Sequence, residues 1–176
     1  MPISDKKPIY GLWPRHTESR LLEKHNLGYL RLPGMDEKAV ADIREWMPRF
    51  SDTKGLIVDV RGNGGGSREA LIELAGWLMD STDAPHVANA CKYRLYDEFR
   101  EDHLSRARFV YRASSEQFGE REKAAISKFM ETFQPEWQPP TEEFSEWHYL
   151  VLSKSADDPR DHYDKPVVIL LSLIHI

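Results

Sequence analysis

A run of apolar residues that ends in consecutive glycines constrains the fold of this chain most strongly. The run is Gly55-Leu-Ile-Val-Asp-Val-Arg-Gly-Asn-Gly-Gly-Gly66. Its first half has the continuous apolar character of a strand that is covered on both faces, as in a parallel sheet. Its second half is rich in glycine, which adopts turn conformations that other residues avoid. We therefore expect a buried strand at residues 56–60, then a tight turn and a helix.

The segments on either side of this run predict a βαβ arrangement. Residues 27–32 alternate in the manner of a half-buried strand, and Asp36 is a suitable N-cap for a helix that extends to about Phe50. A third buried strand is expected at residues 167–171. Strands that alternate with helices in this way predict an α/β domain with a parallel sheet and right-handed crossovers.

The helix after the glycine turn is expected to be capped by Ser67. Its predicted buried stripe consists of Leu71, Leu74, Ala75 and Leu78. Residues 1–26 are interrupted by prolines and are expected to form an irregular lead-in. A variable helical insertion is expected at about residues 92–162, preceded by a strand that starts near Val87 and with its main helix at residues 115–133.

Composition and charge exclude several classes of protein. The chain has 24 basic and 29 acidic residues, a net charge of −5, and so lacks the basic excess of a nucleic-acid-binding protein. No apolar run reaches the roughly 20 residues that span a bilayer, and the N-terminus lacks the apolar stretch of a secretory signal. Cys91 is the only cysteine, so the chain forms no internal disulfide. These features leave the localisation open. Whether Met1 is the natural start of the protein is also open.

The glycine-rich turn can present its backbone N–H groups to an anion. Such turns bind phosphate or stabilise the oxyanion of acyl transfer. A dinucleotide-binding fingerprint that starts at Gly62 requires glycine where Ser67 stands, and a P-loop requires lysine where this chain has Gly66-Ser67-Arg68. These departures disfavour both nucleotide sites. A generic anion site and a turn without any ligand stay open.

The order of these residues resembles the S41 family of serine peptidases, the C-terminal-processing and tricorn-core group. The resemblance covers residues 27–80 and, in support, the segment Tyr163-Asp-Lys-Pro-Val-Val-Ile-Leu170, which is similar to the strand before the nucleophile in that family. It implies a crotonase-like α/β core that cleaves a peptide or protein substrate through a serine acyl-enzyme. It implies no cofactor and no metal. Residues 27–176 would then be the N-terminal portion of such a peptidase domain.

The resemblance assigns the glycine run to the oxyanion hole. Gly65 matches the backbone N–H donor of the family, and Gly64 and Gly66 are its neighbours in the turn. Asp59 and Arg61 could brace this turn from the end of the strand, and they are expected to be a structural ion pair or solvated charges rather than catalytic residues. The family activates its serine with a lysine in one branch and with a histidine and an acidic partner in the other. The sequence does not decide between them.

The C-terminal residues depart from the family pattern. In the family, the strand is followed by a short polar turn and then by a Ser-Ala pair, whose serine is the nucleophile. Here the chain instead reads Leu171-Ser-Leu-Ile-His-Ile176. Ser172 stands too early, inside the apolar run, and is not assigned as the nucleophile. We expect a fragment that is incomplete at the C-terminus and inactive alone, without nucleophile or general base. Residues 172–176 resemble a tail of foreign sequence.

The remaining histidine and acidic residues do not form a recognisable metal site. The seven histidines form no pair at helical metal-site spacing, and a solvated loop is favoured over a cation site for Asp157, Asp158, Asp161 and His162. A noncatalytic peptide-binding module of the same fold is the main alternative function. An acyl-CoA-handling crotonase relative is disfavoured by the Asn-Gly-Gly-Gly run after Asp-Val-Arg. The substrate sequence and any oligomerisation stay open.

Overall fold

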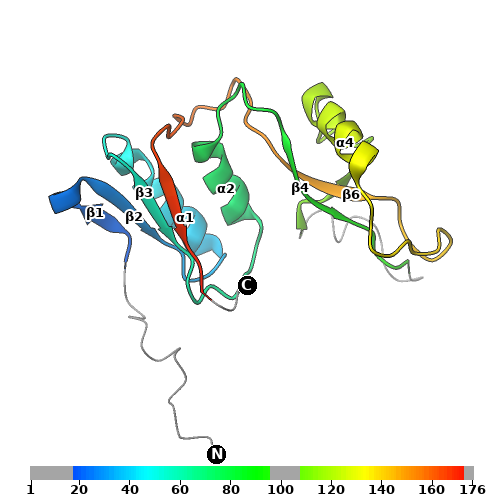
Figure 1. Ribbon diagram of the computed structural model, residues 1–176, viewed down its shortest axis with the longest axis horizontal. Helices are drawn as coiled ribbons and strands as arrows, with labels where there is room; N and C mark the ends of the chain where they lie inside the picture. The colour runs from blue at the N-terminus through cyan, green and yellow to red at the C-terminus, as the bar shows by residue number, and fades with distance from the viewer. Residues whose placement is uncertain (1–17, 96–107, 173–176) are drawn as a thin grey trace, which may run out of the picture. The chain divides into compact units, whose positions relative to one another are not determined.

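The computed structural model describes residues 18–95 and 108–172. The chain has a mixed α/β fold and divides into two compact units, Met1–Gly66 with Asp164–Ile176, and Ser67–Tyr163. Each unit contains its own sheet (Figure 1). In the described part of the chain, none of the helices has the length and apolar character required to cross a bilayer.

The first unit is built on a four-stranded sheet with the order β1-β2-β3-β7. These strands are β1 (Arg20–Leu22), β2 (Leu27–Arg31), β3 (Leu56–Asp59) and β7 (Val167–Leu170). β2, β3 and β7 are parallel, which confirms the predicted parallel sheet, and β1 is antiparallel to β2. β1 and the 3₁₀ turn η2 (Glu23–His25) fall in the stretch that was expected to be irregular, so that expectation is wrong for residues 20–25.

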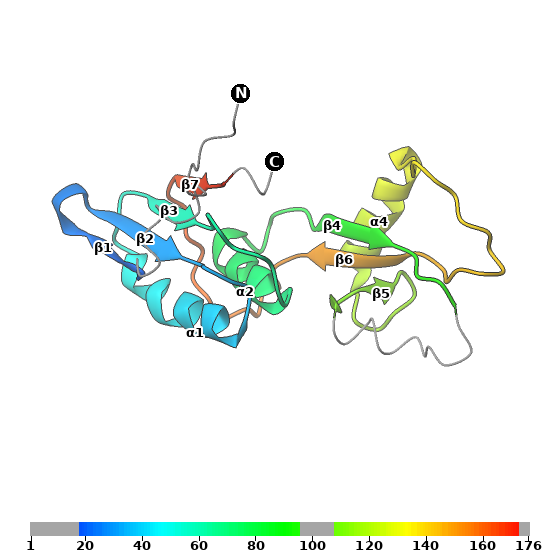
Figure 2. The same cartoon turned by 90° about the horizontal axis from the view of Figure 1, so that it is seen from below.

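Helix α1 (Glu37–Trp46) connects β2 to β3 and lies along one face of the sheet (Figure 2). The Asp36 carboxylate accepts a hydrogen bond from the Ala39 N–H at 2.9 Å, which confirms the predicted N-cap. The predicted apolar face is buried, and it consists of Val40, Ile43, Met47 and Phe50. The helix does not extend to Phe50 as expected. It gives way to the 3₁₀ turn η3 (Pro48–Phe50), because proline has no N–H to continue the helical ladder.

The strands β3 and β7 differ in burial although both were predicted to be buried. Leu56 and Val58 of β3 are at most 2% exposed. In contrast, Val168 and Ile169 of β7 are 54% and 57% exposed. β7 is the outer strand among the described residues, with β3 on one side. The prediction is therefore right about the strand and wrong about its burial.

The second unit contains a three-stranded antiparallel sheet with the order β4-β6-β5 and a helix, α4, packed on it. These elements are β4 (His86–Cys91), β5 (Tyr111–Arg112), α4 (Glu120–Thr132) and β6 (His148–Leu152). Phe118, Ile126 and Tyr149 form the core between helix and sheet. The expected helical insertion thus contains two strands as well as a helix, and its residues 96–107 lie outside the described part. The helix starts later than expected, because Ser115–Phe118 form a turn.

Helix α2 (Glu69–Leu78) follows the glycine turn, as predicted. Its N-cap position is Arg68, but the Ser67 hydroxyl still accepts a hydrogen bond from the Glu69 N–H at 3.1 Å. The predicted leucine stripe is wrong, since the buried residues are Ala70, Glu73 and Gly76. A residue far along the chain covers part of this face, at Glu73 and Gly76. The Arg160 guanidinium lies over this face, 3.4 Å from the Glu73 carboxylate.

Candidate functional site

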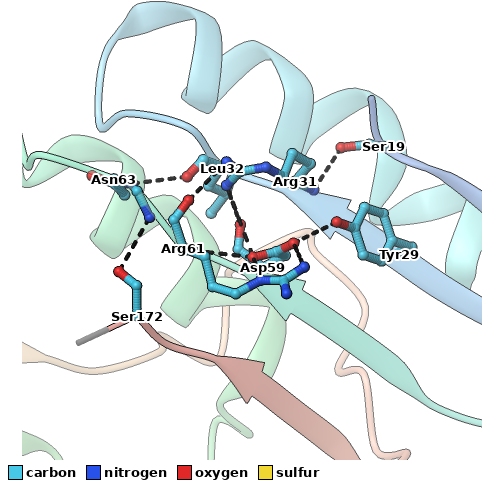
Figure 3. A network of polar contacts seen from close by, with 9 residues as sticks. Ser19, Tyr29, Arg31, Leu32, Asp59, Arg61, Asn63 and Ser172 are labelled. Carbon is cyan, nitrogen blue, oxygen red and sulfur yellow. Dashed lines mark hydrogen bonds and ion pairs between the residues drawn. The ribbon is translucent and has the colours of Figure 1, made fainter. Parts of the chain in front are cut away.

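The carboxyl end of β3 holds a buried carboxylate that is bound from several directions. Asp59, the last residue of β3, accepts hydrogen bonds from the Tyr29 hydroxyl and from the Arg61 backbone N–H (Figure 3). The Arg61 guanidinium binds it through two bonds, Nε to Oδ1 at 2.9 Å and Nη2 to Oδ2 at 2.7 Å. Of the two structural roles expected for Asp59 and Arg61, the structure shows the ion pair and not solvated charges.

Arg31 connects this cluster to the neighbouring strand. Arg31 ends β2 and lies beside Asp59 in the parallel register. Its guanidinium donates to the Asp59 carbonyl at 2.9 Å and to the Arg61 carbonyl at 2.7 Å. Its backbone N–H donates to the Ser19 hydroxyl at 3.0 Å. These bonds fix the start of the glycine turn relative to β2. Arg31 and Tyr29 were not predicted as site residues from the sequence, although their i, i+2 spacing on a strand places both on one face.

The pKa shifts of Asp59, Tyr29 and Arg61 are typical of a structural hydrogen-bond network. Burial raises the pKa of Asp59, but the hydrogen bonds from Arg61 and Tyr29 outweigh it and lower the pKa to about 2. Burial raises the pKa of Tyr29, and its hydrogen bond to Asp59 raises it further. The hydrogen bond to Asp59 also raises the pKa of Arg61. Near neutral pH, Asp59 is therefore an ionised carboxylate that is bound by a guanidinium and a neutral phenol. This state suits a structural role in holding the turn and not a role as a general base.

The glycine run forms a turn directly after this network. Gly65 and Gly66 have positive φ values of 95° and 143°, in the region that favours glycine. A Cβ on Gly66 would lie 2.1 Å from the Met35 carbonyl oxygen, so only glycine fits there. A Cβ on Gly64 would meet no atom within 4 Å. The turn thus depends on close approach at Gly66 and not at Gly64.

The three predicted oxyanion residues lie together in this turn but differ in their hydrogen bonds. The Gly65 N–H donates to Asn63 Oδ1 at 2.8 Å, and the Gly65 carbonyl accepts from the Met35 N–H at 3.0 Å. In the described part of the chain, the N–H groups of Gly64 and Gly66 have no hydrogen-bond acceptor. The turn therefore offers two uncommitted donors at the carboxyl edge of the parallel sheet.

Asn63 is a further residue of this site, and its role was not predicted from the sequence. Its side chain is buried, and its Nδ2 donates to the Leu32 carbonyl at 3.0 Å. It therefore links the end of β2 to the glycine turn, since its other side-chain atom binds the Gly65 N–H. An asparagine that binds a backbone N–H two residues later forms an Asx-turn, and this spacing could have identified it.

Ser172 lies beside the same turn (Figure 3). It follows β7, and its hydroxyl accepts a hydrogen bond from the Gly62 N–H at 3.3 Å. The Val60 N–H donates to the Leu170 carbonyl at 3.1 Å, so β3 and β7 stay paired to their ends. The end of β7 is thereby placed next to the glycine turn.

Of the residues considered for a cation site, Asp158 and His162 have side-chain partners in the structure. Asp158 binds Arg160, and the His162 Nδ1 lies 3.4 Å from the Asp80 carboxylate. The described residues contain no group of three or more His, Cys, Asp or Glu that could hold a metal ion. Trp137 is exposed and packs edge-on against Phe144.

Comparisons with known proteins place these features in a family. The sequence profile of Peptidase family S41 matches residues 26–172. Among solved structures, a proposed peptidase from Parabacteroides merdae is 17% identical with a TM-score of 0.48, over 88% of this chain and 34% of that one. Mature CPAF in complex with lactacystin is also 17% identical, with a TM-score of 0.42, over 84% of this chain and 33% of that one. The chain therefore spans about a third of either structure. A comparison with curated proteins gave no match.

Proposed function

Because this chain belongs to Peptidase family S41, we propose that it serves the hydrolysis of peptide bonds through a serine acyl-enzyme, on a crotonase-like α/β core. One observation carries the proposal. The glycine turn stands at the carboxyl edge of a parallel sheet and has two backbone N–H groups without an acceptor among the described residues. Such donors stabilise the oxyanion of acyl transfer.

The turn has a defined place in this reaction. A serine hydroxyl attacks the carbonyl carbon of the peptide bond, and the carbonyl oxygen becomes negatively charged. The C–N bond then breaks, the amine leaves with a proton, and water hydrolyses the ester. The turn would bind the negative oxygen, and loss of one such donor costs roughly 10²–10³-fold in kcat. The Asp59, Arg61 and Arg31 bonds hold the turn rigid, so the donors need not reorganise.

We assign neither the nucleophile nor the general base to residues 18–95 or 108–172. The Ser172 hydroxyl is engaged by the Gly62 N–H, and its place in the sequence differs from that of the family nucleophile. We propose that the nucleophile follows β7 in a Ser-Ala segment, since residues 163–170 resemble the family strand before it. The end of β7 lies beside the turn, as this requires.

The test is protease activity of the gene product, measured with casein and with a fluorophosphonate probe for reactive serines. We expect hydrolysis and labelling only in a product that contains a Ser-Ala segment after β7. The substitution Gly66→Ala should lower kcat, whereas the matched change Gly34→Ala should not, because a Cβ on Gly34 meets no atom closer than 3.8 Å. Labelling of Ser172 that disappears in Ser172→Ala would overturn the assignment. Peptide binding by an intact gene product with no reactive serine would instead identify a noncatalytic module.

A further inference from the structure

The second unit contains a cavity that has no part in the proposed function. Its volume is about 640 Å³, within the range of roughly 300–1,000 Å³ that is usual for small-ligand sites. The elements that line it include the N-terminus of α4, strand β5, the end of β6 and the segment after β6 (Figure 2). These elements supply both aromatic rings and charged groups, so the chemistry of the lining indicates the class of ligand.

Three aromatic residues line this cavity, and they are Phe109, Tyr111 and Phe118. The rings of Tyr111 and Phe118 pack edge to face, with centroids 6.0 Å apart and an interplanar angle of 84°. Phe109 has a φ of 53°, which is unusual for a bulky residue, and such conformations cluster at ligand-binding sites. The faces of aromatic rings carry partial negative charge and attract cations. The rings therefore favour a cation over an anion as the ligand.

Glu122 contributes a carboxylate to the same lining. Burial raises the pKa of Glu122, but hydrogen bonds from the Ser153 hydroxyl and from the backbone N–H groups of Glu122 and Gly119 outweigh it, so the pKa lies below its usual value. These donors are all neutral. Glu122 has no ion-pair partner in the described part of the second unit, whereas Glu120 is paired with Lys123 at 3.4 Å. The ionised Glu122 carboxylate is thus held in place without an ion pair.

Two cationic residues also line the cavity, and both donate to backbone carbonyls of the protein. The Arg121 guanidinium binds the Asp83 carbonyl at 2.6 Å. The Lys154 side chain is 5% exposed, and its Nζ binds the Arg160 carbonyl at 2.7 Å. Arg121 also lowers the pKa of Glu122, but less than the hydrogen bonds do. The carboxylate therefore keeps acceptor capacity for a cation that enters from solvent.

We propose that this cavity binds a cation on an apolar stem, namely the ammonium or guanidinium of a lysine or arginine side chain in a peptide. The cation lies between the Glu122 carboxylate and the aromatic rings, and the stem lies against Leu150 and Val151. A hydrogen bond between two charged groups is roughly twice as strong as one between neutral groups. The proposal does not depend on peptide hydrolysis, because it concerns the second unit alone and holds for a peptidase and for a noncatalytic module.

The test is an NMR titration of the ¹⁵N-labelled chain with N-acetyl-lysine methylamide and with N-acetyl-norleucine methylamide, which has a similar stem but no ammonium. We expect the lysine compound to bind roughly tenfold more tightly and to shift the amide signals of residues 119–122 and 153–156. Equal affinities, or shifts confined to other residues, would overturn the proposal. Tighter binding of N-acetyl-glutamate methylamide would also overturn it and would identify Arg121 as the binding group.

Cadaverine distinguishes a peptide side chain from a free amine as the source of the cation. It carries the same ammonium without a peptide backbone. Weaker binding of cadaverine than of the lysine compound is expected, and it supports a site for peptides. Tighter binding of cadaverine would support the cation site but would overturn its assignment to peptides.

A carboxylate variant tests the proposed contact directly. Glu122→Gln should weaken binding of the lysine compound by about tenfold and leave the norleucine compound unaffected, and glutamine at this position still caps the helix. Glu120→Gln is the matched control and should change the affinity by less than about twofold, because Glu120 is already paired with Lys123. An unchanged affinity in folded Glu122→Gln would refute the proposal. If that variant does not fold, the comparison of the lysine and norleucine compounds in the wild type decides.

Discussion

Gly66 is the residue of the turn whose backbone lies closest against the backbone of Met35, in the segment that follows β2. A Cβ there would lie 2.1 Å from the Met35 carbonyl oxygen, and its φ of 143° is strained for any other residue. We expect Gly66→Ala to destabilise the chain by about 2 kcal/mol, because backbone atoms rather than a flexible side chain must move. Gly64→Ala is the matched control, since a Cβ there meets no atom within 4 Å. Chemical denaturation of both variants tests this, and equal midpoints would contradict it.

Asp59 makes the stability of the chain depend on pH in the acid range. Its pKa is lowered from 3.8 to about 2 in the folded chain, because the hydrogen bonds from Arg61 and Tyr29 outweigh burial. A lowered folded pKa stabilises the fold above the unfolded pKa, and this contribution is lost as the pH falls toward the folded pKa. The shift corresponds to about 2 kcal/mol near neutral pH.

We therefore expect Asp59→Asn to lower the free energy of unfolding by about 2 kcal/mol near pH 7. The difference from wild type should shrink as the pH falls from about 4 to about 2, where the wild-type carboxylate takes up its proton. Urea denaturation at several pH values measures this. A difference that stays constant over the range would show that Asp59 acts by packing alone.

On the scale of the secondary-structure elements, α2 is held by a contact that overrides its hydrophobic pattern. A Cβ on Gly76 would lie 2.1 Å from Cζ of Arg160, whose guanidinium also binds the Glu73 carbonyl at 3.2 Å and Asp158. Alanine improves helix propensity by about 1 kcal/mol over glycine, but here it must displace a guanidinium from a buried glutamate. We expect the loss to exceed the gain, so Gly76→Ala should lower the Tm.

The same substitution should have the opposite effect once Arg160 is removed. An Arg160→Ala background removes the three atoms nearest to a Cβ on Gly76, and there Gly76→Ala should raise stability by about 1 kcal/mol through helix propensity. A double-mutant cycle by thermal denaturation gives the sign in each background. The same sign in both backgrounds would show that Arg160 does not control this face.

The sequence allowed some elements to be predicted because their patterns are local. Strand β3 has a continuous apolar run, and α1 has both an N-cap and an apolar face, so both were predicted. The buried face of α2 was not, because Arg160 is remote in the sequence and no local pattern contains it. The burial of β7 was overestimated, since composition cannot distinguish an outer strand from a central one. Strand β1 is only three residues long and gives little periodicity.

For the candidate site, the sequence located the glycine turn and the Asp59–Arg61 pair. It could not rank the three glycines, because the ranking depends on which N–H is engaged. The bond from Gly65 to Asn63 and the bond from Met35 to Gly65 are consequences of how the turn sits against β2. Residue type alone therefore located the turn, and the hydrogen bonds distinguish the engaged Gly65 N–H from the N–H groups of its two neighbours.

On the scale of the whole molecule, each compact unit has buried residues of its own. Phe50 is fully buried in the first unit, where its ring lies against Gly28 of β2, and Ile126 is buried in the second unit between α4 and its sheet. Both Phe50→Ala and Ile126→Ala should cost about 2–5 kcal/mol, through lost burial and the cavity that remains. We expect each to raise amide exchange most strongly in its own unit.

The same two substitutions test which unit holds the glycine turn of the candidate site. Residues 62–66 and all of their hydrogen-bond partners named above belong to the first unit. The Gly65 N–H is bound by Asn63 Oδ1, and so it is expected to exchange slowly. Ile126→Ala should leave this exchange close to its wild-type rate, whereas Phe50→Ala should accelerate it, because the turn follows β3, which pairs with β2. Residue-resolved exchange in the two variants measures both effects. If Ile126→Ala accelerated Gly65 as much as Phe50→Ala does, the turn would depend on the fold of both units, and its geometry could not be attributed to the first unit alone.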